Sequence, residues 1–296
     1  MSVIVKLTDG LGNQLFQYAC GLAVAMRTNQ PLLVDNTWYR SIAEQYTKRK
    51  YLLNQFNISA AEATEKEINI LKKPKYPIII NSLYYRWQYS LPTYKRRYYK
   101  EPHFHYDGNT FKINKSVYLE GFWQSECYFK EIKEPLLQEF SLKKPLSASA
   151  QAIEKQILFT NSVAVHIRRG DYTQRNKNPE HQLLPVIYYN EAIQQMNTLL
   201  VAPYFYIFSD DINWVKDNLP IEQAVKFVSI NTESELEDFA LMKSCKHHII
   251  ANSSFSWWGA WLSESPNQNV IAPKDWFTHN SPKQKNDLVP KEWTQL

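Results

Sequence analysis

The sequence predicts an α/β protein in which two domains are each built on a parallel sheet. Three observations support this fold class. Strand, glycine-turn, helix and strand patterns follow one another over residues 3–34. From residue 150 onward, short apolar strand patterns alternate with helix patterns, as in doubly wound parallel sheets. Between these two parts, Lys143-Lys-Pro-Leu-Ser147 has the composition of a hinge.

The expected N-terminal domain covers residues 1–145 and begins with a buried strand over residues 3–7. The loop Asp9-Gly-Leu-Gly12 ends this strand, and a helix follows because apolar residues recur at three- and four-residue steps over residues 15–26. The other elements expected here are strands over residues 32–34 and 117–122 and a helix over residues 128–140. We expect residues 40–115 to be irregular.

The expected C-terminal domain covers residues 146–296, and its tail after residue 275 is expected to pack back on the N-terminal domain. Its strands are expected over residues 162–168, 204–208, 225–229, 248–251 and 270–272. Its helices are expected over residues 150–158, 189–200, 233–244 and 255–262, with a short one near Trp214. Thr232 and Glu235 form a capping-box pattern. Parallel sheets bind ligands beyond the carboxyl ends of their strands, so residues just after each strand are the candidates for a site.

The composition excludes several classes of protein. Of 296 residues, 44% are hydrophobic and 21% are charged, which excludes collagen, coiled coil and long disorder. No apolar run approaches the roughly 20 residues of a spanning helix, and the first residues lack the apolar region of a signal peptide. We therefore expect a soluble, cytoplasmic protein. Cys20, Cys127 and Cys245 are odd in number and far apart, so neither a disulfide framework nor a zinc site is expected.

One segment, residues 68–100, concentrates the positive charge. The whole chain has 34 basic and 29 acidic residues, a net charge of +5, whereas this segment has eight Lys or Arg and no acidic residue. Eight aromatic residues lie in the same segment. This mixture is typical of a nucleic-acid surface, an anionic membrane surface or a sugar-stacking platform, and equally of a solvated, tyrosine-rich domain edge.

Residues typical of phosphate binding follow strands of both expected domains. Gly10, Gly12 and Asn13 follow the first strand, where glycines let backbone N–H groups approach an anion and a helix N-terminus points at it. Arg168 and Arg169 end the strand over residues 162–168 and offer donor forks suited to phosphate.

Hydroxyl and acidic residues follow other strands. Ser253 and Ser254 precede a helix, where they add hydroxyl donors to the free helix N–H groups. Each residue also has a structural interpretation: serines and the pair Asp210-Asp211 cap helices, His166 fits a satisfied core histidine, and Asp171 fits a turn. Their occurrence together at four strand ends favours a ligand site.

The residues do not match two familiar phosphate motifs. Gly10 and Gly12 are followed by Leu15, so the third glycine of a dinucleotide-binding turn is missing, and no G-K-[ST] P-loop occurs. The close acidic pair Asp210-Asp211 is contiguous and lacks the Asp-x-Asp spacing of metal-dependent sugar transferases. A diphosphate held by arginine, serine and backbone N–H groups needs no metal, so we expect neither a metal nor a cofactor.

Four blocks, in order from residue 8 to about 262, resemble the α-1,2-fucosyltransferases of glycosyltransferase family 11. His166-Ile-Arg-Arg-Gly-Asp-Tyr172 resembles the HxRRGDY motif of that family. Gly10-Leu-Gly-Asn-Gln-Leu-Phe-Gln-Tyr18 resembles its amino-terminal motif. Gly121-Phe-Trp-Gln-Ser-Glu-Cys-Tyr-Phe129 and the stretch from Asp238 to Gly259 are similar to the remaining motifs.

The resemblance implies a GT-B fold, with two facing Rossmann-like domains, and a nucleotide sugar held mainly by the second. It implies metal-free transfer of fucose from GDP-fucose, with inversion, to the 2-hydroxyl of a terminal galactose on an oligosaccharide of the O-antigen type. The donor-binding residues that it implies are Gly10, Gly12, Asn13, His166, Arg168, Asp238, Ser253, Ser254 and Phe255. Asp238 falls where related α-1,6-fucosyltransferases place the carboxylate that reads guanine.

The resemblance also implies catalytic and acceptor-side residues. Arg168 and Asn13 would act on the diphosphate and the sugar, with Arg168 stabilising the charge on the leaving phosphate. Inversion calls for a base near the acceptor hydroxyl unless the transition state is highly dissociative, and Asp171 and Glu126 are both candidates. Trp123 and Glu126 are expected to bind the acceptor.

The same residues also fit other functions. A non-catalytic carbohydrate-binding protein would use the aromatics of residues 76–106, and a nucleic-acid binder would use the basic segment. Within fucosyl transfer, an α-1,6 or a protein O-fucosyl linkage is the nearest alternative. We expect no nucleic-acid partner, a lipid-linked acceptor, and peripheral contact with the inner membrane face through residues 68–100.

Overall fold

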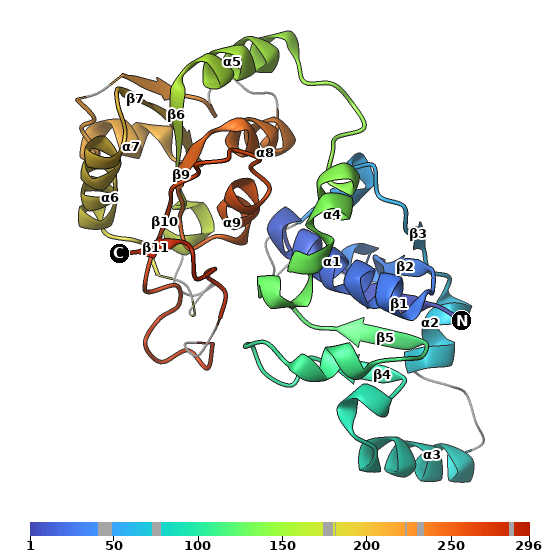
Figure 1. Ribbon diagram of the computed structural model, residues 1–296. Helices are drawn as coiled ribbons and strands as arrows, with labels where there is room; N and C mark the ends of the chain where they lie inside the picture. The colour runs from blue at the N-terminus through green and yellow to red at the C-terminus, as the bar shows by residue number, and fades with distance from the viewer. Residues whose placement is uncertain are drawn as a thin grey trace. The chain divides into compact units, whose positions relative to one another are not determined.

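A computed structural model describes the chain except for residues 41–48, 73–77, 174–179, 181, 223, 230–233 and 284–286 and the side chains of residues 78–81, 85 and 171. It divides into two compact units (Figure 1). Unit 1 comprises Met1–Lys143 together with Asp287 and Leu288, and unit 2 comprises the remainder from Lys144 onward. The boundary between the units falls after Lys143, whereas the sequence predicts it after residue 145. The Tyr106 N–H donates to the Asp287 carboxylate at 2.9 Å, which attaches this part of the tail to unit 1.

Unit 1 is built on a parallel sheet, with strand order β3-β2-β1-β5-β4 in its described part. The strands are β1 (Val3–Lys6), β2 (Leu32–Asp35), β3 (Ala61–Glu62), β4 (Tyr98–Lys100) and β5 (Val117–Glu120). The helix α1 (Leu11–Thr28) follows β1 and packs on the sheet, with Leu15 and Phe16 fully buried. Because β1 and β5 are neighbours, the loops that follow them lie at the same edge of the sheet.

Residues 40–115 contain more regular structure than the sequence predicts. Besides β3 and β4 they form the helices α2 (Glu65–Lys72) and α3 (Ile78–Ser90). The two strands are two and three residues long, too short for an alternating pattern to show. α3 leaves Leu83 and Trp87 exposed, so its apolar residues do not follow the one-sided pattern of a core helix.

The helix predicted over residues 128–140 is shorter in the structure. Two 3-10 turns, Glu126–Tyr128 and Lys130–Ile132, precede α4 (Lys133–Glu139). Phe129 separates the turns with φ −146° and ψ 0°, outside the helical range, because its ring is buried against Phe16.

Unit 2 is a doubly wound parallel sheet with strand order β11-β10-β9-β6-β7-β8 in its described part (Figure 1). The strands are β6 (Asn161–Ile167), β7 (Pro203–Ser209), β8 (Val225–Phe227), β9 (His247–Ile249), β10 (Val270–Ala272) and β11 (Thr294–Gln295). The helices are α5 (Ala148–Phe159), α6 (Val186–Leu199), α7 (Ile212–Asn218), α8 (Glu235–Ser244) and α9 (Ser254–Trp261). The order matches that of a dinucleotide-binding sheet, although its glycine motif is missing.

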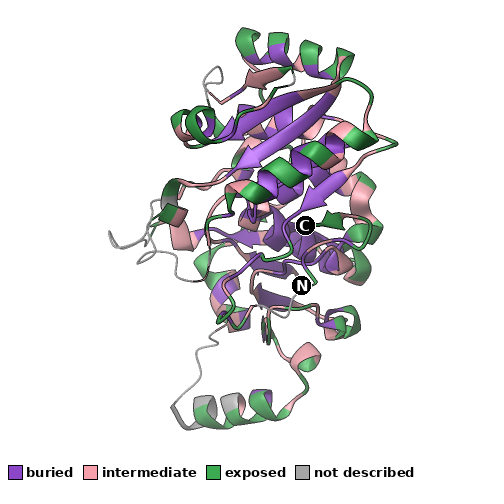
Figure 2. Cartoon of the chain, turned by 90° about the vertical axis from the view of Figure 1, so that its left-hand side faces the viewer, coloured by how far each residue is buried: buried purple, intermediate pink, exposed green. Residues whose placement is uncertain are grey.

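Both faces of the unit 2 sheet are covered, as Figure 2 shows by the buried strands between partly exposed helices. Val163, Val165 and Ile167 point into a core shared with α6 and α7. Ala164, between them in sequence, points into a second core shared with α5 and α8. A strand buried on both faces reads as a continuous apolar run, which explains why the sequence identified it.

Two details of unit 2 differ from expectation. Ser234, rather than Thr232, caps α8, and its side chain accepts a hydrogen bond from the Glu237 N–H; Thr232 lies outside the described residues. β11 has two exposed residues and was not predicted. None of the described helices has the length and hydropathy needed to cross a membrane.

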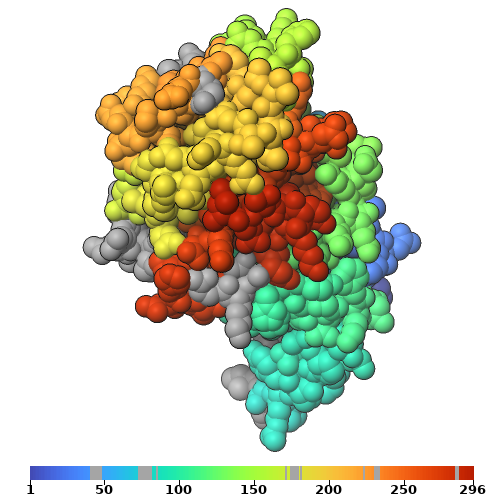
Figure 3. All heavy atoms as spheres, turned by 60° about the vertical axis from the view of Figure 1, so that its left-hand side comes forward, coloured from blue at the N-terminus to red at the C-terminus, as the bar shows by residue number. Residues whose placement is uncertain are grey.

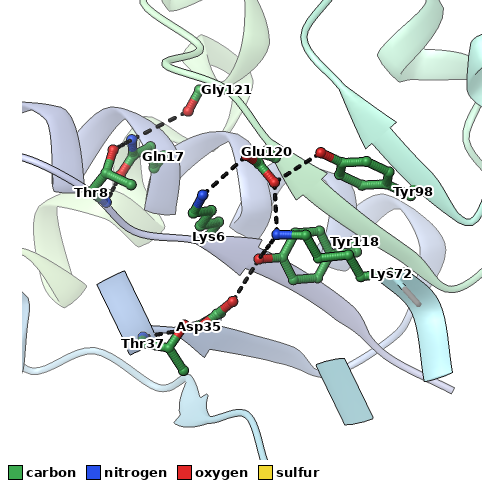
Figure 4. A network of polar contacts seen from close by, with 10 residues as sticks. All are labelled: Lys6, Thr8, Gln17, Asp35, Thr37, Lys72, Tyr98, Tyr118, Glu120 and Gly121. Carbon is green, nitrogen blue, oxygen red and sulfur yellow. Dashed lines mark hydrogen bonds and ion pairs between the residues drawn. The ribbon is translucent and has the colours of Figure 1, made fainter. Parts of the chain in front are cut away.

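A polar network lies at the carboxyl edge of the unit 1 sheet, beside the end of α2 (Figure 4). Three donors reach the Glu120 carboxylate at 3.0 Å each, namely Lys6, Lys72 and Tyr98. The buried Tyr118 hydroxyl donates to Asp35 at 2.6 Å. The network joins the last residues of β1, β2 and β5 and anchors α2 to them.

We expect this network to stabilise unit 1 in a pH-dependent way. Burial alone would raise the pKa of Glu120, but hydrogen bonds from Lys72 and Lys6 and their charges lower it from 4.5 to about 2. Because this pKa is lower in the folded than in the unfolded state, the stabilisation is complete above the unfolded pKa and is lost as the pH falls through the folded one.

Glu120→Gln should therefore lower the free energy of unfolding by about 2 kcal/mol at pH 7. The difference from the unchanged protein should close as the pH falls from about 5 to about 2. Chemical denaturation at a series of pH values measures it. A difference that stays constant over this range would show that ionisation of Glu120 does not contribute.

Candidate functional site

The sheet of unit 2 reverses its winding direction between β6 and β9. β7 and β8 lie on one side of β6, and β9, β10 and β11 lie on the other. Connections that leave neighbouring central strands in opposite directions open a crevice at their carboxyl ends, which is where such sheets bind ligands. The segments at this point are the one that follows Ile167 and the one that follows Ile249, and both carry residues that the sequence singled out.

Two arginines after β6 are paired with two aspartates after β7. Arg168 Nη1 lies 2.7 Å from Asp210 Oδ2, and Arg169 Nε lies 3.1 Å from Asp211 Oδ2. Asp210 also accepts a hydrogen bond from the Arg169 backbone N–H at 2.9 Å. The Arg169 guanidinium lies over the Trp214 ring, 3.7 Å from its centroid. These contacts hold both guanidinium groups in fixed positions at the strand end.

The two aspartates have different roles. Asp211 caps α7 by accepting a hydrogen bond from the Trp214 N–H at 3.2 Å, as the structural interpretation of the pair predicts. Asp210 is committed to the arginine segment instead. A Cβ atom at Gly170 would lie 2.6 Å from Asp210 Oδ2, so a side chain there would displace the carboxylate from Arg168.

His166 is buried and uncharged. Its ring packs against Phe255 at 5.7 Å, and Phe255 packs against Phe239 at 5.4 Å. Burial, followed by the positive charge of Arg168, lowers the pKa of His166 well below its usual 6.5. Its Nδ1 has no hydrogen-bond partner among the described residues. At neutral pH the ring therefore contributes a polar atom without adding charge.

The start of α9 supplies backbone N–H groups to the same point. Ser253 is the N-cap, but its side chain makes no capping hydrogen bond. Ser254 and Phe255 form the first turn, and this end of the helix is positive through the helix dipole. The Tyr172 hydroxyl donates to the Asn252 carbonyl at 3.0 Å, which ties the segment after β6 to the segment after β9.

Asp238 lies on α8 at the same edge of the sheet. Its Oδ2 accepts a hydrogen bond from the Ser229 hydroxyl at 2.7 Å. Ser229, which follows β8, in turn accepts from the backbone N–H of Ser209, the last residue of β7. The carboxylate is therefore fixed at the ends of β7 and β8.

These groups together have the chemistry of an anion site. They comprise paired arginines, a helix N-terminus, a neutral histidine and hydroxyl groups. Within the described part of the chain, no group of three or more His, Cys, Asp or Glu is placed to hold a metal ion. Guanidinium forks with helix N–H groups are suited to a phosphate or diphosphate.

Unit 1 has a smaller set of candidate residues than unit 2, at the carboxyl edge of its own sheet. Gly10 is the N-cap of α1, and Gly12 and Asn13 lie in its first turn. A Cβ atom at Gly10 would meet no atom within 4 Å, so chain packing does not require glycine there. The Asn13 side chain accepts a hydrogen bond from Gln124 at 2.7 Å, which joins the start of α1 to the loop after β5.

Two buried glutamines of the same block have structural roles that the sequence did not predict. The Gln14 side chain forms hydrogen bonds with backbone groups of residues 50–53. The Gln17 side chain bonds to Thr8 and donates to the Gly121 carbonyl at 3.2 Å (Figure 4). Buried amides need several partners, and these come from segments far apart in the chain, so local patterns do not reveal them.

Glu101 holds the loop after β5. Its carboxylate accepts hydrogen bonds from the backbone N–H groups of Phe122 at 2.7 Å and Trp123 at 3.0 Å. Trp123 has φ +57°, a left-handed conformation that is rare for a bulky residue. A Cβ atom at Gly121 would lie 2.4 Å from the Glu101 side chain, so this position requires glycine. The strained loop persists because such contacts fix it.

The acceptor-side residues predicted from the sequence are placed differently from one another. Trp123 is fully buried against Tyr99 and Tyr128, at ring distances of 5.8 and 5.5 Å. It therefore offers no exposed ring face to an acceptor, because its left-handed backbone turns the ring into the core. Glu126 is partly exposed at the start of a 3-10 turn. The side chain of Asp171 lies outside the described residues, so its role as a base stays a prediction.

Comparison with known proteins finds relatives along the whole chain. The profile of the family described as "Glycosyl transferase family 11" matches residues 2–296. An alpha-1,2-colitosyltransferase of Escherichia coli is 35% identical, with 100% of this chain and 99% of that protein covered. The O-antigen biosynthesis glycosyltransferase WbnK of Escherichia coli is 31% identical, with 98% and 99% covered. Galactoside alpha-(1,2)-fucosyltransferase 1 of Leontopithecus chrysomelas is 31% identical over 49% of this chain and 42% of its own length.

Solved structures with a similar fold include fucosyltransferases. NodZ alpha-1,6-fucosyltransferase soaked with GDP-fucose has a TM-score of 0.52 at 16% identity, covering 88% of this chain and 91% of its own. Arabidopsis thaliana FUT1 in complex with GDP has a TM-score of 0.52 at 11% identity, covering 93% and 71%. At these identities the likeness concerns the fold alone. The predicted α/β fold class of GT-B type, with two parallel-sheet units, is confirmed.

Glu101→Gln tests whether the hydrogen bonds from the Phe122 and Trp123 backbone N–H groups to the Glu101 carboxylate stabilise unit 1. The amide leaves one backbone N–H facing an NH₂ group, so we expect a loss of about 1–3 kcal/mol in the free energy of unfolding. Denaturant unfolding measures the loss, and Glu131→Gln, an exposed carboxylate thirty residues later, is the matched control. If both variants unfold at the same denaturant concentration as the unchanged protein, Glu101 does not hold the loop.

Proposed function

The chain belongs to glycosyl transferase family 11, and we propose that this glycosyltransferase moves L-fucose from GDP-fucose to the 2-hydroxyl of a terminal galactose on an oligosaccharide, with inversion. Two relatives have names that specify α-1,2 linkages, one matched over its full length and one over part of it. These names favour an α-1,2 linkage over α-1,6 or protein O-fucosyl transfer. The name of a further full-length relative places it in O-antigen biosynthesis, which favours an oligosaccharide of that kind as acceptor.

The observation that carries the proposal is the pair of arginines after β6, each held by an aspartate after β7. Arg168 is held by Asp210 at 2.7 Å, and α9 begins after β9, the strand next to β6. We propose that Arg168 and the first-turn N–H groups, with the hydroxyls of Ser253 and Ser254, bind the donor diphosphate. Neutral His166 and Phe255 would line the nucleotide without adding charge.

The same groups account for catalysis of the transfer. As the bond from the sugar to the diphosphate breaks, negative charge grows on the β-phosphate. A guanidinium already held in place stabilises this charge without reorganising during the reaction, and losing one such donor commonly costs about 3 kcal/mol. The arginine and backbone N–H groups offer the diphosphate hydrogen bonds that need no divalent ion, so we propose that no metal takes part.

We propose that Asn13, positioned by Gln124, contacts the sugar. The galactose hydroxyl must lose a proton during inversion. Glu126, which is partly exposed, and Asp171 are the candidate bases, and a dissociative transition state would need neither.

One further donor is favoured by a specific observation. The 35% identical relative that matches the whole chain is named as a colitosyltransferase, and colitose is fucose without its 3-hydroxyl. The two donors therefore differ by a single hydroxyl. A site that hydrogen-bonds this hydroxyl would reject colitose strongly, whereas an apolar contact would discriminate only weakly.

The deciding experiment incubates the purified chain with GDP-fucose and a panel of oligosaccharides ending in β-galactose, with EDTA present. We expect fucose on O2 of the galactose, identified by NMR of the product. Transfer to another hydroxyl would contradict the linkage, and hydrolysis without transfer on every acceptor would contradict the acceptor class. A parallel reaction with nucleotide-activated colitose compares kcat/KM for the two donors.

Arg168→Ala should reduce kcat/KM at least about a hundredfold, because charge stabilisation on the leaving diphosphate is lost. Arg168→Lys should recover little, since a point charge cannot reproduce the guanidinium fork. Arg40→Ala is the control, because Arg40 is two-thirds exposed. If Arg168→Ala has kinetics close to those of the control, Arg169 rather than Arg168 would stabilise the charge on the leaving diphosphate.

Asp238→Asn should weaken recognition of guanine more than turnover of bound donor. Guanine offers two adjacent donors, N1–H and the N2 amine, and an amide accepts at one end only. We expect calorimetry to show that the unchanged protein prefers GDP to IDP, which lacks the N2 amine, and that Asp238→Asn loses this preference. Asp217→Asn on the exposed side of α7 is the control. An unchanged preference together with a lower kcat would exclude Asp238 as the base-reading residue.

A further inference from the structure

We propose that α3 and the segment after it form a docking surface for an anionic lipid bilayer. We define this surface by the described side chains of Leu83, Arg86, Trp87, Lys95 and Arg97. Figure 3 shows residues near α3 and β4, drawn in turquoise, projecting from the rest of unit 1. The proposal goes beyond sugar transfer and does not depend on which sugar is moved.

α3 presents an apolar face to solvent. Leu83 is 63% exposed and Trp87 is 54% exposed, and because they are four residues apart they share one face of the helix. Gln88 points another way and is buried, where its side-chain oxygen accepts a hydrogen bond from the Arg97 N–H at 3.1 Å. Its burial and this hydrogen bond fix the inward side of the helix, so the exposure of Leu83 and Trp87 follows from how the helix is attached.

The attachment also holds the end of the helix. Arg96 donates to the carbonyls of Tyr89 and Leu91 at 3.0 Å each, and its guanidinium lies 5.5 Å from the Tyr89 ring. These contacts tie α3 to the segment that leads into β4. The apolar face is therefore presented by a helix with a defined orientation, next to the basic residues that follow it.

The charge around this face fits an anionic surface. Residues 68–100 contain eight basic and no acidic residues. Arg86, Lys95, Arg97 and Lys100 are exposed, whereas Lys72 is paired with Glu120. Tryptophan, tyrosine and leucine among arginine and lysine are typical of segments that lie in the headgroup region of anionic membranes.

The charges and apolar residues of this surface favour an anionic bilayer over a second copy of the chain and over a nucleic acid. A second copy of the same face would bring like charges together, which opposes self-association. A nucleic acid would use the cations but would have no use for the exposed leucine on the same face. α5 provides a contrast, since Leu158 and Phe159 are 58% and 90% exposed there, but the neighbouring charges, Glu154 and Lys155, cancel.

The experiment is cosedimentation of the full chain with vesicles of zwitterionic lipid alone and of zwitterionic lipid with about 30% anionic phospholipid, at low and physiological salt. We expect binding to the anionic vesicles only, weakened by salt. Lys95→Glu with Arg97→Glu should lower the partition coefficient at least about tenfold. Leu83→Ser with Trp87→Ser should lower it about fivefold or more without changing the net charge.

Matched controls use unit 2. Lys144→Glu with Lys155→Glu changes the net charge equally at exposed positions, and Leu158→Ser with Phe159→Ser removes an exposed apolar pair. Thermal unfolding confirms that each variant is folded. The proposal is overturned by any of three outcomes: no binding to anionic vesicles at low salt, equal losses in the controls, or sedimentation-velocity evidence that Leu83 and Trp87 mediate self-association instead. Binding of RNA with unchanged affinity in the Leu83 and Trp87 variant, without vesicle binding, would replace it with a nucleic-acid role.

Discussion

The parallel direction of every strand pair in both sheets places the functional groups of this protein. In unit 2 it brings the ends of β6, β7, β8 and β9 to one edge, and the winding reverses between β6 and β9, which is where sheets of this kind bind ligands. Arg168, Asp210 and the start of α9 are distant in sequence and meet at this edge because each follows a strand. The same rule places Asn13 beside Gln124 in unit 1, across the neighbours β1 and β5.

At both edges a carboxylate from another strand end fixes the backbone of the loop. Glu101 follows β4 and binds the N–H groups after β5, and Asp210 follows β7 and binds an N–H group after β6. In each case a glycine faces the carboxylate and leaves space for it, Gly121 in unit 1 and Gly170 in unit 2. The strand ends are thereby held in place by short charged links as well as by the sheets, which suits sites that must keep their donors aligned.

The sequence predicted the elements that have a strong pattern and missed those that depend on distant partners. The apolar run of β6 and the periodicity of α1 were sufficient because both are buried along most of their length. β3 and β4 are held by their neighbours in the sheet and have no pattern of their own. The predicted residues around Arg168 do meet at one edge, but the pairing with Asp210 and the inward turn of Trp123 depend on backbone geometry that local sequence does not encode.

The glycine and carboxylate pairs have a consequence for how the two loops vary during evolution. A Cβ atom at Gly121 would lie 2.4 Å from the Glu101 side chain, and one at Gly170 would lie 2.6 Å from the Asp210 carboxylate. Replacing the glycine first would push out the carboxylate, and replacing the carboxylate first would leave backbone N–H groups without an acceptor. Substitutions at the glycine and at the carboxylate are therefore expected to be epistatic, that is, non-additive in their effect on stability.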